Sequence, residues 1–364
     1  MILEQYAKLL VHYCLEAKPG ERLFLRSTTL AEPLVREIYK EACKSGVWVE
    51  VDMAFEDQAQ ILLEHGTDNI LQQVSPFYEK AIRDFDLMLS IRAPFKMHME
   101  TVSVERSRLR QKAFEEVNKT YYKRYGNGGF RTALCQYPTE AWAQEAGMSL
   151  EECTHFVYNA CKLFEEDPVT AWLDVRAHQQ KIVDYLDQRK EFRYRSAGTD
   201  IRFRTDDRVW INSDGKHNMP SGEVYTSPVE DSVEGVVHFA YPVIYRGEEM
   251  EGVTLWVEKG YIEKWEAKKG QKMLEELFKV NGARYFGEAA IGTNYQIDRF
   301  TKNILFDEKI GGTVHMAVGQ SYAAAGGKNT SSVHLDMIAD MSNGGEIFAD
   351  GEKCYDSGKF LFLD

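Results

Sequence analysis

The chain has 364 residues, of which 44% are hydrophobic and 28% are charged, and its net charge is −13 with a pI near 5.3. This length exceeds what one hydrophobic core usually supports, so we expect two domains. The acidic balance argues against a nucleic-acid partner, and since no apolar run approaches the roughly 18 residues of a membrane span, we expect a soluble protein without a membrane partner.

The first half of the chain alternates helix and strand patterns. The expected helices span about 2–17, 33–45 and 102–118, followed by two or three helices between 139 and 189. The expected strands span 21–26, 47–51, 86–91 and 131–136. Strands separated by helices indicate a parallel sheet with helices on both faces.

The pattern changes near residue 190. Apolar residues alternate over 192–210, and 233–256 is rich in Val, Tyr and Phe, which is typical of antiparallel strands. One helix is expected over about 264–280, ended by Asn281 and Gly282. We therefore predict an α/β domain over 1–190 with a parallel sheet, and a C-terminal β-rich α+β domain over 191–364.

The cysteines and the N-terminal residues indicate in which cellular compartment the protein is expected. The six cysteines form no CxxC pair and are scattered through apolar stretches, which is typical of reduced, mostly buried thiols. The first residues lack the charged and apolar regions of a signal peptide and begin an amphipathic helix pattern instead. We expect a cytoplasmic protein.

Carboxylates and histidines gather in four short segments of the second half, at 217–228, 285–294, 306–322 and 329–338. In a strand over 333–338, His334 and Asp336 would project from one face, and the apolar residues between them would face the core. Taken singly, such residues are more often structural than ligating. Together, imidazoles and carboxylates suit Zn²⁺, Co²⁺ or Mn²⁺, so this half is the candidate metal site.

These four segments also carry a family resemblance. NMPSGEVYTSP, GEAAIGTN, DEKIGGTVHMAVGQSY and SSVHLDMI resemble, in order and spacing, the signature blocks of the aminopeptidase T/aminopeptidase S family of dinuclear metallo-aminopeptidases. With the 18–21 stretch KPGE and the α/β pattern, the resemblance covers nearly the whole chain, although the chain is somewhat shorter than is usual for the family.

The resemblance implies roles for particular residues. The metal ligands it implies are Glu223, Glu288, His315, His334 and Asp336. Among them Glu288 is the candidate bridge between two divalent ions, which would be Zn²⁺, Co²⁺ or Mn²⁺, with Mg²⁺ also compatible. Tyr322 matches a tyrosine near the metals that steadies a developing oxyanion or contacts an ion. Glu308 is either a further ligand or the catalytic base.

The resemblance further implies a metal-dependent aminopeptidase that hydrolyses N-terminal residues from short peptides. It also implies a homodimer, in which the α/β domain makes dimer contacts and helps to close the cavity of the other subunit. Two alternatives remain at this point. One is another metal-dependent amide hydrolase with the same site, and the other is a non-catalytic α/β binding protein. The sequence leaves the native metal and the side-chain preference open.

Overall fold

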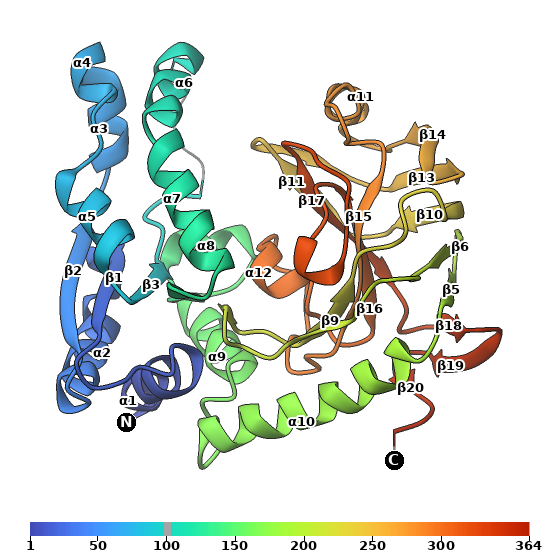
Figure 1. The fold of residues 1–364 in the computed structure, drawn as a ribbon, viewed down its shortest axis with the longest axis horizontal. Coiled ribbons are helices and arrows are strands. Elements are labelled where there is room, and N and C mark those ends of the chain that lie inside the picture. The colour runs from blue at the N-terminus through green and yellow to red at the C-terminus, as the bar shows by residue number, and fades with distance from the viewer. Residues whose placement is uncertain (98–102, 364) are drawn as a thin grey trace. The chain divides into compact units, whose positions relative to one another are not determined.

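The computed structural model describes residues 1–97 and 103–363, and the chain divides into two compact units (Figure 1). The first unit comprises Met1–Ala171 and Gly215–Pro220, and the second comprises Trp172–Asp214 and Ser221–Asp364. The chain leaves the first unit and enters the second within helix α10 (Pro168–Asp187), which is earlier in the sequence than the pattern change near residue 190. Gly215–Pro220 belongs to the first unit because its strand β8 pairs in parallel with β4.

The first unit is built on a parallel sheet with the strand order β2-β1-β3-β4-β8, which confirms the predicted α/β class. Its strands are β1 (Arg22–Thr28), β2 (Trp48–Ala54), β3 (Leu87–Arg92), β4 (Arg131–Gln136) and β8 (Asn218–Met219). Its helices are α1 (Ile2–Lys8) with a π-helical continuation (Leu9–Cys14), α2 (Glu32–Lys44), α3 (Gln58–His65), α4 (Asp68–Leu71), α5 (Pro76–Asp84), α6 (Val104–Ala113), α7 (Glu115–Gly126), α8 (Glu140–Glu145) and α9 (Leu150–Ala160), with a 3-10 turn at Thr29–Ala31.

Burial and capping explain these elements. Phe24 of β1 and Met88 of β3 pack with Ile82 of α5 and Val117 of α7, so these helices cover one face of the sheet. The helix expected over 102–118 is two helices; Val102 lies outside the described residues, and α6 begins after Ser103, whose hydroxyl accepts a hydrogen bond from the Arg106 amide.

The second unit is antiparallel and β-rich, as predicted. Its two large sheets have the orders β14-β13-β10-β6-β5-β18-β19-β20 and β17-β16-β15-β9-β7, beside a β11-β12 hairpin. The strands are β5 (Glu191–Ser196), β6 (Thr199–Arg204), β7 (Ile211–Ser213), β9 (Glu223–Thr226), β10 (Glu234–Phe239), β11 (Val243–Tyr245), β12 (Glu248–Met250), β13 (Val253–Glu258), β14 (Tyr261–Glu266), β15 (Phe286–Gly292), β16 (Thr313–Gly319), β17 (His334–Asp340), β18 (Glu346–Ala349), β19 (Glu352–Asp356) and β20 (Lys359–Phe360). The remaining elements are the part of α10 from Trp172 onward, α11 (Gln271–Leu277), α12 (Ile304–Asp307) and a 3-10 turn at Ala323–Ala325.

The helix expected over 264–280 is wrong at both ends. Trp265 lies in β14, where it pairs with Leu255 of β13 and extends the sheet. Helix α11 begins only after Gly270, which has a left-handed φ of +80° and therefore interrupts any helix that starts earlier. Sheet pairing overrides the helical spacing of this segment because its apolar residues also fit a strand.

Both large sheets of the second unit contribute to one buried apolar cluster. Ile201 and Val237 come from the eight-stranded sheet, and Met316 and Met337 come from the five-stranded sheet. This shared core occupies one face of the five-stranded sheet. Its opposite face carries the candidate site.

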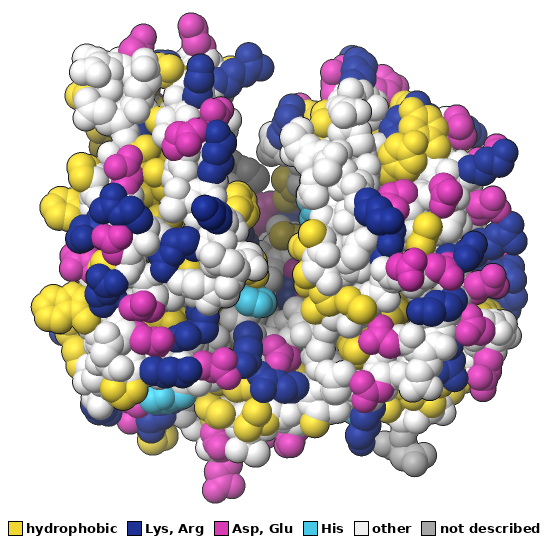
Figure 2. Space-filling model, in the orientation of Figure 1, with side chains coloured by type: hydrophobic (Ala, Val, Ile, Leu, Met, Phe, Trp, Pro, Cys, Tyr) yellow, Lys and Arg dark blue, Asp and Glu magenta, His cyan; other side chains and the backbone are white. Residues whose placement is uncertain are grey.

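The surface carries both signs of charge, and basic and acidic side chains are interspersed over the face shown in Figure 2. Many form exposed pairs, such as Arg193 Nε with Asp200 Oδ1 at 2.6 Å, which contribute little to stability. None of the described helices combines the length and the apolar character that crossing a bilayer requires. The six cysteines are free thiols, and all except Cys43 are buried.

Candidate metal centre

The face of the five-stranded sheet opposite the core alternates functional and small residues. Its residues are Glu288, Ala290 and Gly292 from β15, His315, Ala317 and Gly319 from β16, and His334, Asp336 and Ile338 from β17. The register pairs Ala317 with Glu288 on one side and with Asp336 on the other, so an alanine separates the two carboxylates. Small side chains between the polar ones leave space above the sheet for another group.

A β-bulge turns Glu288 to this face. Phe286 points into the core, so in a regular strand Glu288, two residues later, would do the same. The register shifts between Phe286 and Glu288, which moves the carboxylate to the opposite face. Gly287 permits the bulge, since a Cβ there would lie 2.3 Å from the Gln320 carbonyl oxygen. Ser227 Oγ donates a 2.8 Å hydrogen bond to the Gly287 carbonyl and fixes it.

A second glycine precedes Glu223, the first residue of β9. Gly222 has a φ of +118°, and a Cβ there would lie 2.7 Å from the Cβ of Asn294. The backbone of Glu223 is held from α10, where the buried Gln179 donates from Nε2 to the Glu223 carbonyl at 3.2 Å. Glu223 therefore enters the site from a neighbouring strand, opposite Gly292.

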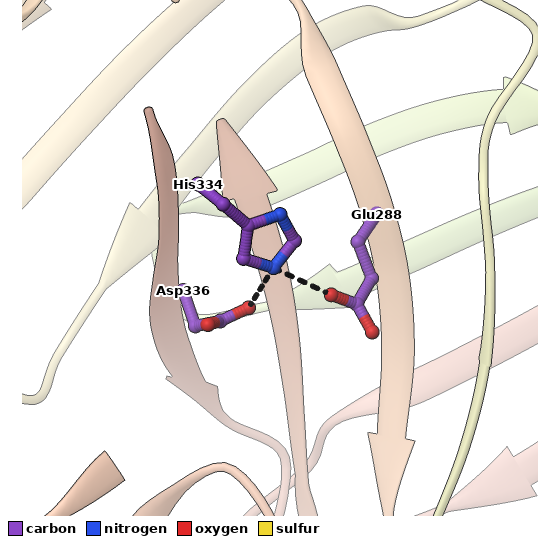
Figure 3. A group of neighbouring side chains, drawn as sticks. All are labelled: Glu288, His334 and Asp336. Carbon is purple, nitrogen blue, oxygen red and sulfur yellow. Dashed lines mark ion pairs between the residues drawn. The ribbon is translucent and has the colours of Figure 1, made fainter. Parts of the chain in front are cut away.

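The tightest cluster of ligand atoms is formed by Glu288, His334 and Asp336, drawn in Figure 3. His334 Nε2 lies 3.1 Å from Glu288 Oε2 and 3.4 Å from Asp336 Oδ1. The other ring nitrogen, Nδ1, lies 2.7 Å from the Gln320 carbonyl oxygen, to which it donates. That hydrogen bond leaves Nε2 available to a cation whenever the ring is neutral, the arrangement usual for metal-bound histidines.

A second cluster shares Glu288 with the first. His315 Nε2 lies 3.4 Å from Glu223 Oε2 and 3.8 Å from Glu288 Oε1. The two oxygens of Glu288 thus face different histidines, Oε2 towards His334 and Oε1 towards His315. All three residues of this second cluster are buried.

The charges of the site favour cations. Burial lowers the pKa of His334, but Asp336 and Glu288 outweigh it and raise that pKa to about 12. Burial likewise opposes the rise in the pKa of His315, which Glu288 and Glu223 bring to about 9. Burial raises the pKa of Asp336, but His334 outweighs it and holds the pKa below its usual range. The carboxylates therefore stabilise positive charge at both histidines.

Lys309 is a site residue that the sequence interpretation missed. Its side chain is fully buried, contacts the Glu308 carboxylate and lies 3.7 Å from Glu223 Oε1. Burial lowers its pKa, but Glu223 and Glu308 raise it above the usual value, so the ammonium stays charged. The sequence carries no signal for it, because lysines in turns are usually exposed and its burial depends on the tertiary structure.

Glu308 and Tyr322 lie beside the candidate metal ligands. Burial raises the pKa of Glu308 to about 8; Glu223 and Asp336 also raise it, and Lys309 opposes them. The Tyr322 hydroxyl lies 3.4 Å from His334 Nε2, and its partial burial together with Glu288 and Asp336 raises its pKa well above the usual value. Tyr322 is tied to the bulge, since its amide donates to Ser227 Oγ at 3.2 Å.

The donor atoms suit a metal ion. Within the described residues, the buried oxygens Glu223 Oε2 and Asp336 Oδ1 have no hydrogen-bond partner. Buried polar atoms are normally satisfied, and a cation between carboxylate oxygens and imidazole nitrogens would satisfy such a set. The structure thus brings together all five residues predicted as ligands, with Tyr322 and Glu308 beside them; their individual roles remain predictions.

Comparisons with known proteins, by sequence and by fold, agree with a metal centre in this chain. The sequence model of the family described as Thermophilic metalloprotease (M29) matches residues 1–360. The chain is 26% identical to Aminopeptidase 2 of Geobacillus stearothermophilus and 27% identical to Aminopeptidase AmpS of Bacillus subtilis, in each case over 99% of this chain and 98% of the relative. Its fold matches wild-type AmpT from Thermus thermophilus with a TM-score of 0.85 at 22% identity, over 99% of both chains.

Proposed function

The chain belongs to the M29 family of metalloproteases and is a metallo-aminopeptidase, and from this premise we propose that it removes N-terminal residues from short peptides by means of water activated between two divalent metal ions. The observation that carries the proposal is the position of Glu288. Its Oε2 lies 3.1 Å from His334 Nε2, and its Oε1 lies 3.8 Å from His315 Nε2. A carboxylate shared in this way supports one bridging ligand between two ions.

The donor set divides into two groups about this bridge. Glu288, His334 and Asp336 would hold one ion, and Glu288, His315 and Glu223 the other. Mixed nitrogen and oxygen donors suit Zn²⁺, Co²⁺ and Mn²⁺ and tolerate Mg²⁺, so metal supply would decide the native ion. When bound, such a pair lowers the pKa of a coordinated water towards neutrality and polarises the scissile carbonyl.

Glu308 is the candidate general base. Its raised pKa, about 8, lies close to neutral pH, where a carboxyl group exchanges protons most effectively. It would take a proton from the attacking water and pass it to the nitrogen of the leaving amine. Lys309, in contact with this carboxylate, holds it at the edge of the site and keeps part of it ionised.

Tyr322 is the candidate oxyanion donor. Its phenol keeps its proton because partial burial and the nearby carboxylates raise its pKa. Its hydroxyl lies next to His334 and so beside the position where the tetrahedral oxygen would develop negative charge. A free α-amino group can bind a divalent ion and an acetylated one cannot, which supports a preference for peptides with unblocked N-termini.

A direct test uses metal-stripped protein and short peptides with free or acetylated N-termini. Release of amino acid is measured with EDTA and after addition of Co²⁺, Zn²⁺ or Mn²⁺. We expect metal-dependent cleavage of the free-amine peptides only, with two metal ions bound per chain. Cleavage of acetylated peptides, or full activity with a single ion, would contradict the proposal.

Glu308→Gln separates the two roles considered for this residue. As the base, its loss lowers kcat by about a hundredfold to ten-thousandfold while both ions stay bound. The readouts are turnover and metal content of the same sample. Loss of an ion would make Glu308 a ligand instead, and an unchanged rate would exclude both roles.

The family resemblance also leads us to propose a homodimer. Sedimentation equilibrium tests it directly, since the chain mass is 41.8 kDa. A species of this mass at micromolar concentration would contradict the dimer without affecting the proposed chemistry.

A further inference from the structure

An apolar cavity of about 300 Å³ opens beside the candidate metal centre, and His334 and Asp336 form part of its wall. The next residue on the same face of β17 is Ile338, which also lines the cavity. Successive residues on one face of a strand lie about 7 Å apart. Leu335, between the two ligands in sequence, lines it as well, so the cavity follows β17, the edge strand of its sheet, from the ligands over about the length of one amino-acid side chain.

The remaining walls are largely aliphatic and aromatic. Val243 and Ile244 come from the β11-β12 hairpin, Ile304 from α12, and Phe300 from the loop before it. Ile244 and Ile304 are 37% and 40% exposed, so the apolar surface faces the open side of the cavity. An apolar concavity beside a few polar groups is the usual form of a binding site for a small group.

Two charged residues also line the cavity, and both are engaged within the fold. Lys302 Nζ forms an ion pair with Glu249 Oε2 at 3.0 Å. Asp307 Oδ1 accepts hydrogen bonds from the amide and the hydroxyl of Thr301, each at 2.8 Å. Because Lys302 is ion-paired and Asp307 is hydrogen-bonded within the fold, the cavity offers an incoming side chain mainly apolar contact.

We propose that this cavity receives the side chain of the N-terminal residue of the substrate and selects large apolar residues such as Leu, Ile, Met and Phe. The inference rests on the proposed function, because it places the free amine and the scissile carbonyl at the ligands. Both groups are attached to the Cα of the first residue, so its side chain is the one that reaches a cavity walled by those ligands. The second residue begins beyond the scissile bond and lies farther away.

The test compares two peptide series on protein loaded with Co²⁺. In Xaa-Ala-Ala and Ala-Xaa-Ala, Xaa is Ala, Leu, Phe, Lys or Glu, and kcat/KM is measured for release of the first residue. We expect Leu and Phe to exceed Ala, Lys and Glu by about tenfold or more at the first position, and by much less at the second. Equal rates across the first-position series, or a preference confined to the second position, would overturn the assignment.

Substitutions of cavity residues test the same subsite assignment by changing the protein instead of the substrate. Ile304→Glu and Ile244→Glu alter half-exposed positions and should lower kcat/KM for Leu-Ala-Ala about tenfold more than for Ala-Ala-Ala. Leu361→Glu is the matched control, since Leu361 is 53% exposed in the same unit and lies outside the cavity. If all three variants behave alike, the cavity is not the subsite.

A binding measurement supplies a readout that does not depend on turnover. Free L-leucine should raise the melting temperature more than L-alanine at equal concentration, and Ile304→Glu should remove the difference. An equal shift from both amino acids would count against the subsite. Metal-dependent release of alanine without any first-position preference would overturn the subsite alone. Failure to cleave any free-amine peptide would overturn the proposed function, and the subsite with it.

Discussion

The two faces of the five-stranded sheet are made from the same strands but have opposite requirements. On one face, Met316 and Met337 are buried in a core shared with the eight-stranded sheet, and only volume and shape matter there. On the other, His315 and Asp336 lie within ion-pair distance of other titratable side chains, separated by alanine and glycine. One face minimises polar groups, and the other concentrates them. Core packing thus holds the strands while the opposite face keeps charges close together.

Two residues of β17, one on each face, give the sharpest test of this difference. His334→Ala should abolish binding of one ion and lower kcat/KM by on the order of a thousandfold or more, equivalent to about 4 kcal/mol of barrier. Met337→Ala, on the core face, should cost about 2–5 kcal/mol of unfolding free energy and retain metal. Metal analysis, turnover and urea unfolding of both variants decide the point. Full activity of the His334 variant would remove this residue from the site.

Lys309→Met tests whether the buried carboxylates depend on the charge between them. Removing one partner of a buried ionic group usually costs about 3–5 kcal/mol, because the remaining charges lose their compensation. We expect that loss in urea unfolding of the metal-free protein. Lys279→Met breaks an exposed pair with Glu276 and serves as the control, with no measurable change. Equal effects of the two substitutions would show that Lys309 is dispensable.

Gly287→Ala tests the bulge that turns Glu288 to the site face. The added Cβ would lie 2.3 Å from the Gln320 carbonyl oxygen, so the strand must shift. We expect a loss of about 1–3 kcal/mol of stability and weaker metal binding together. Gly126→Ala, where a Cβ meets nothing within 4 Å, is the control. Lower stability with unchanged metal affinity would separate the bulge from the site.

Tyr322→Phe has the smallest expected effect. It removes one hydroxyl and leaves the ring contact with His334, whose centroid lies 5.1 Å away. We expect a decrease of about tenfold to a hundredfold in kcat with metal content and stability unchanged. Tyr122→Phe, at a 69% exposed tyrosine of the first unit, should leave the rate unchanged. An unaltered rate in the Tyr322 variant would leave this residue a packing role only.

Much of the architecture follows from local pattern. The strand at Arg131–Gln136 agrees with its expected bounds, because its apolar residues have no competing helical spacing. The segment after residue 260 does not, because pairing of Trp265 with Leu255 decides its structure and lies outside any local window. Helix α10 shows the same limit: its sequence predicts a helix, but its tertiary hydrogen bonds, such as those of Gln179 to the Ser213 and Glu223 carbonyls, join residues distant in sequence.

The sequence by itself determined the class of each half of the chain, the four segments that meet at the site and the alternation that puts His334 and Asp336 on one face. These are properties of periods and spacings along the chain. Only the tertiary structure showed that Glu288 reaches that face through a bulge, that Lys309 lies buried between two carboxylates, and that an apolar cavity adjoins the ligands. Each of these depends on contacts between strands and loops distant in sequence, where the register and the close approach of another backbone decide the direction of a side chain.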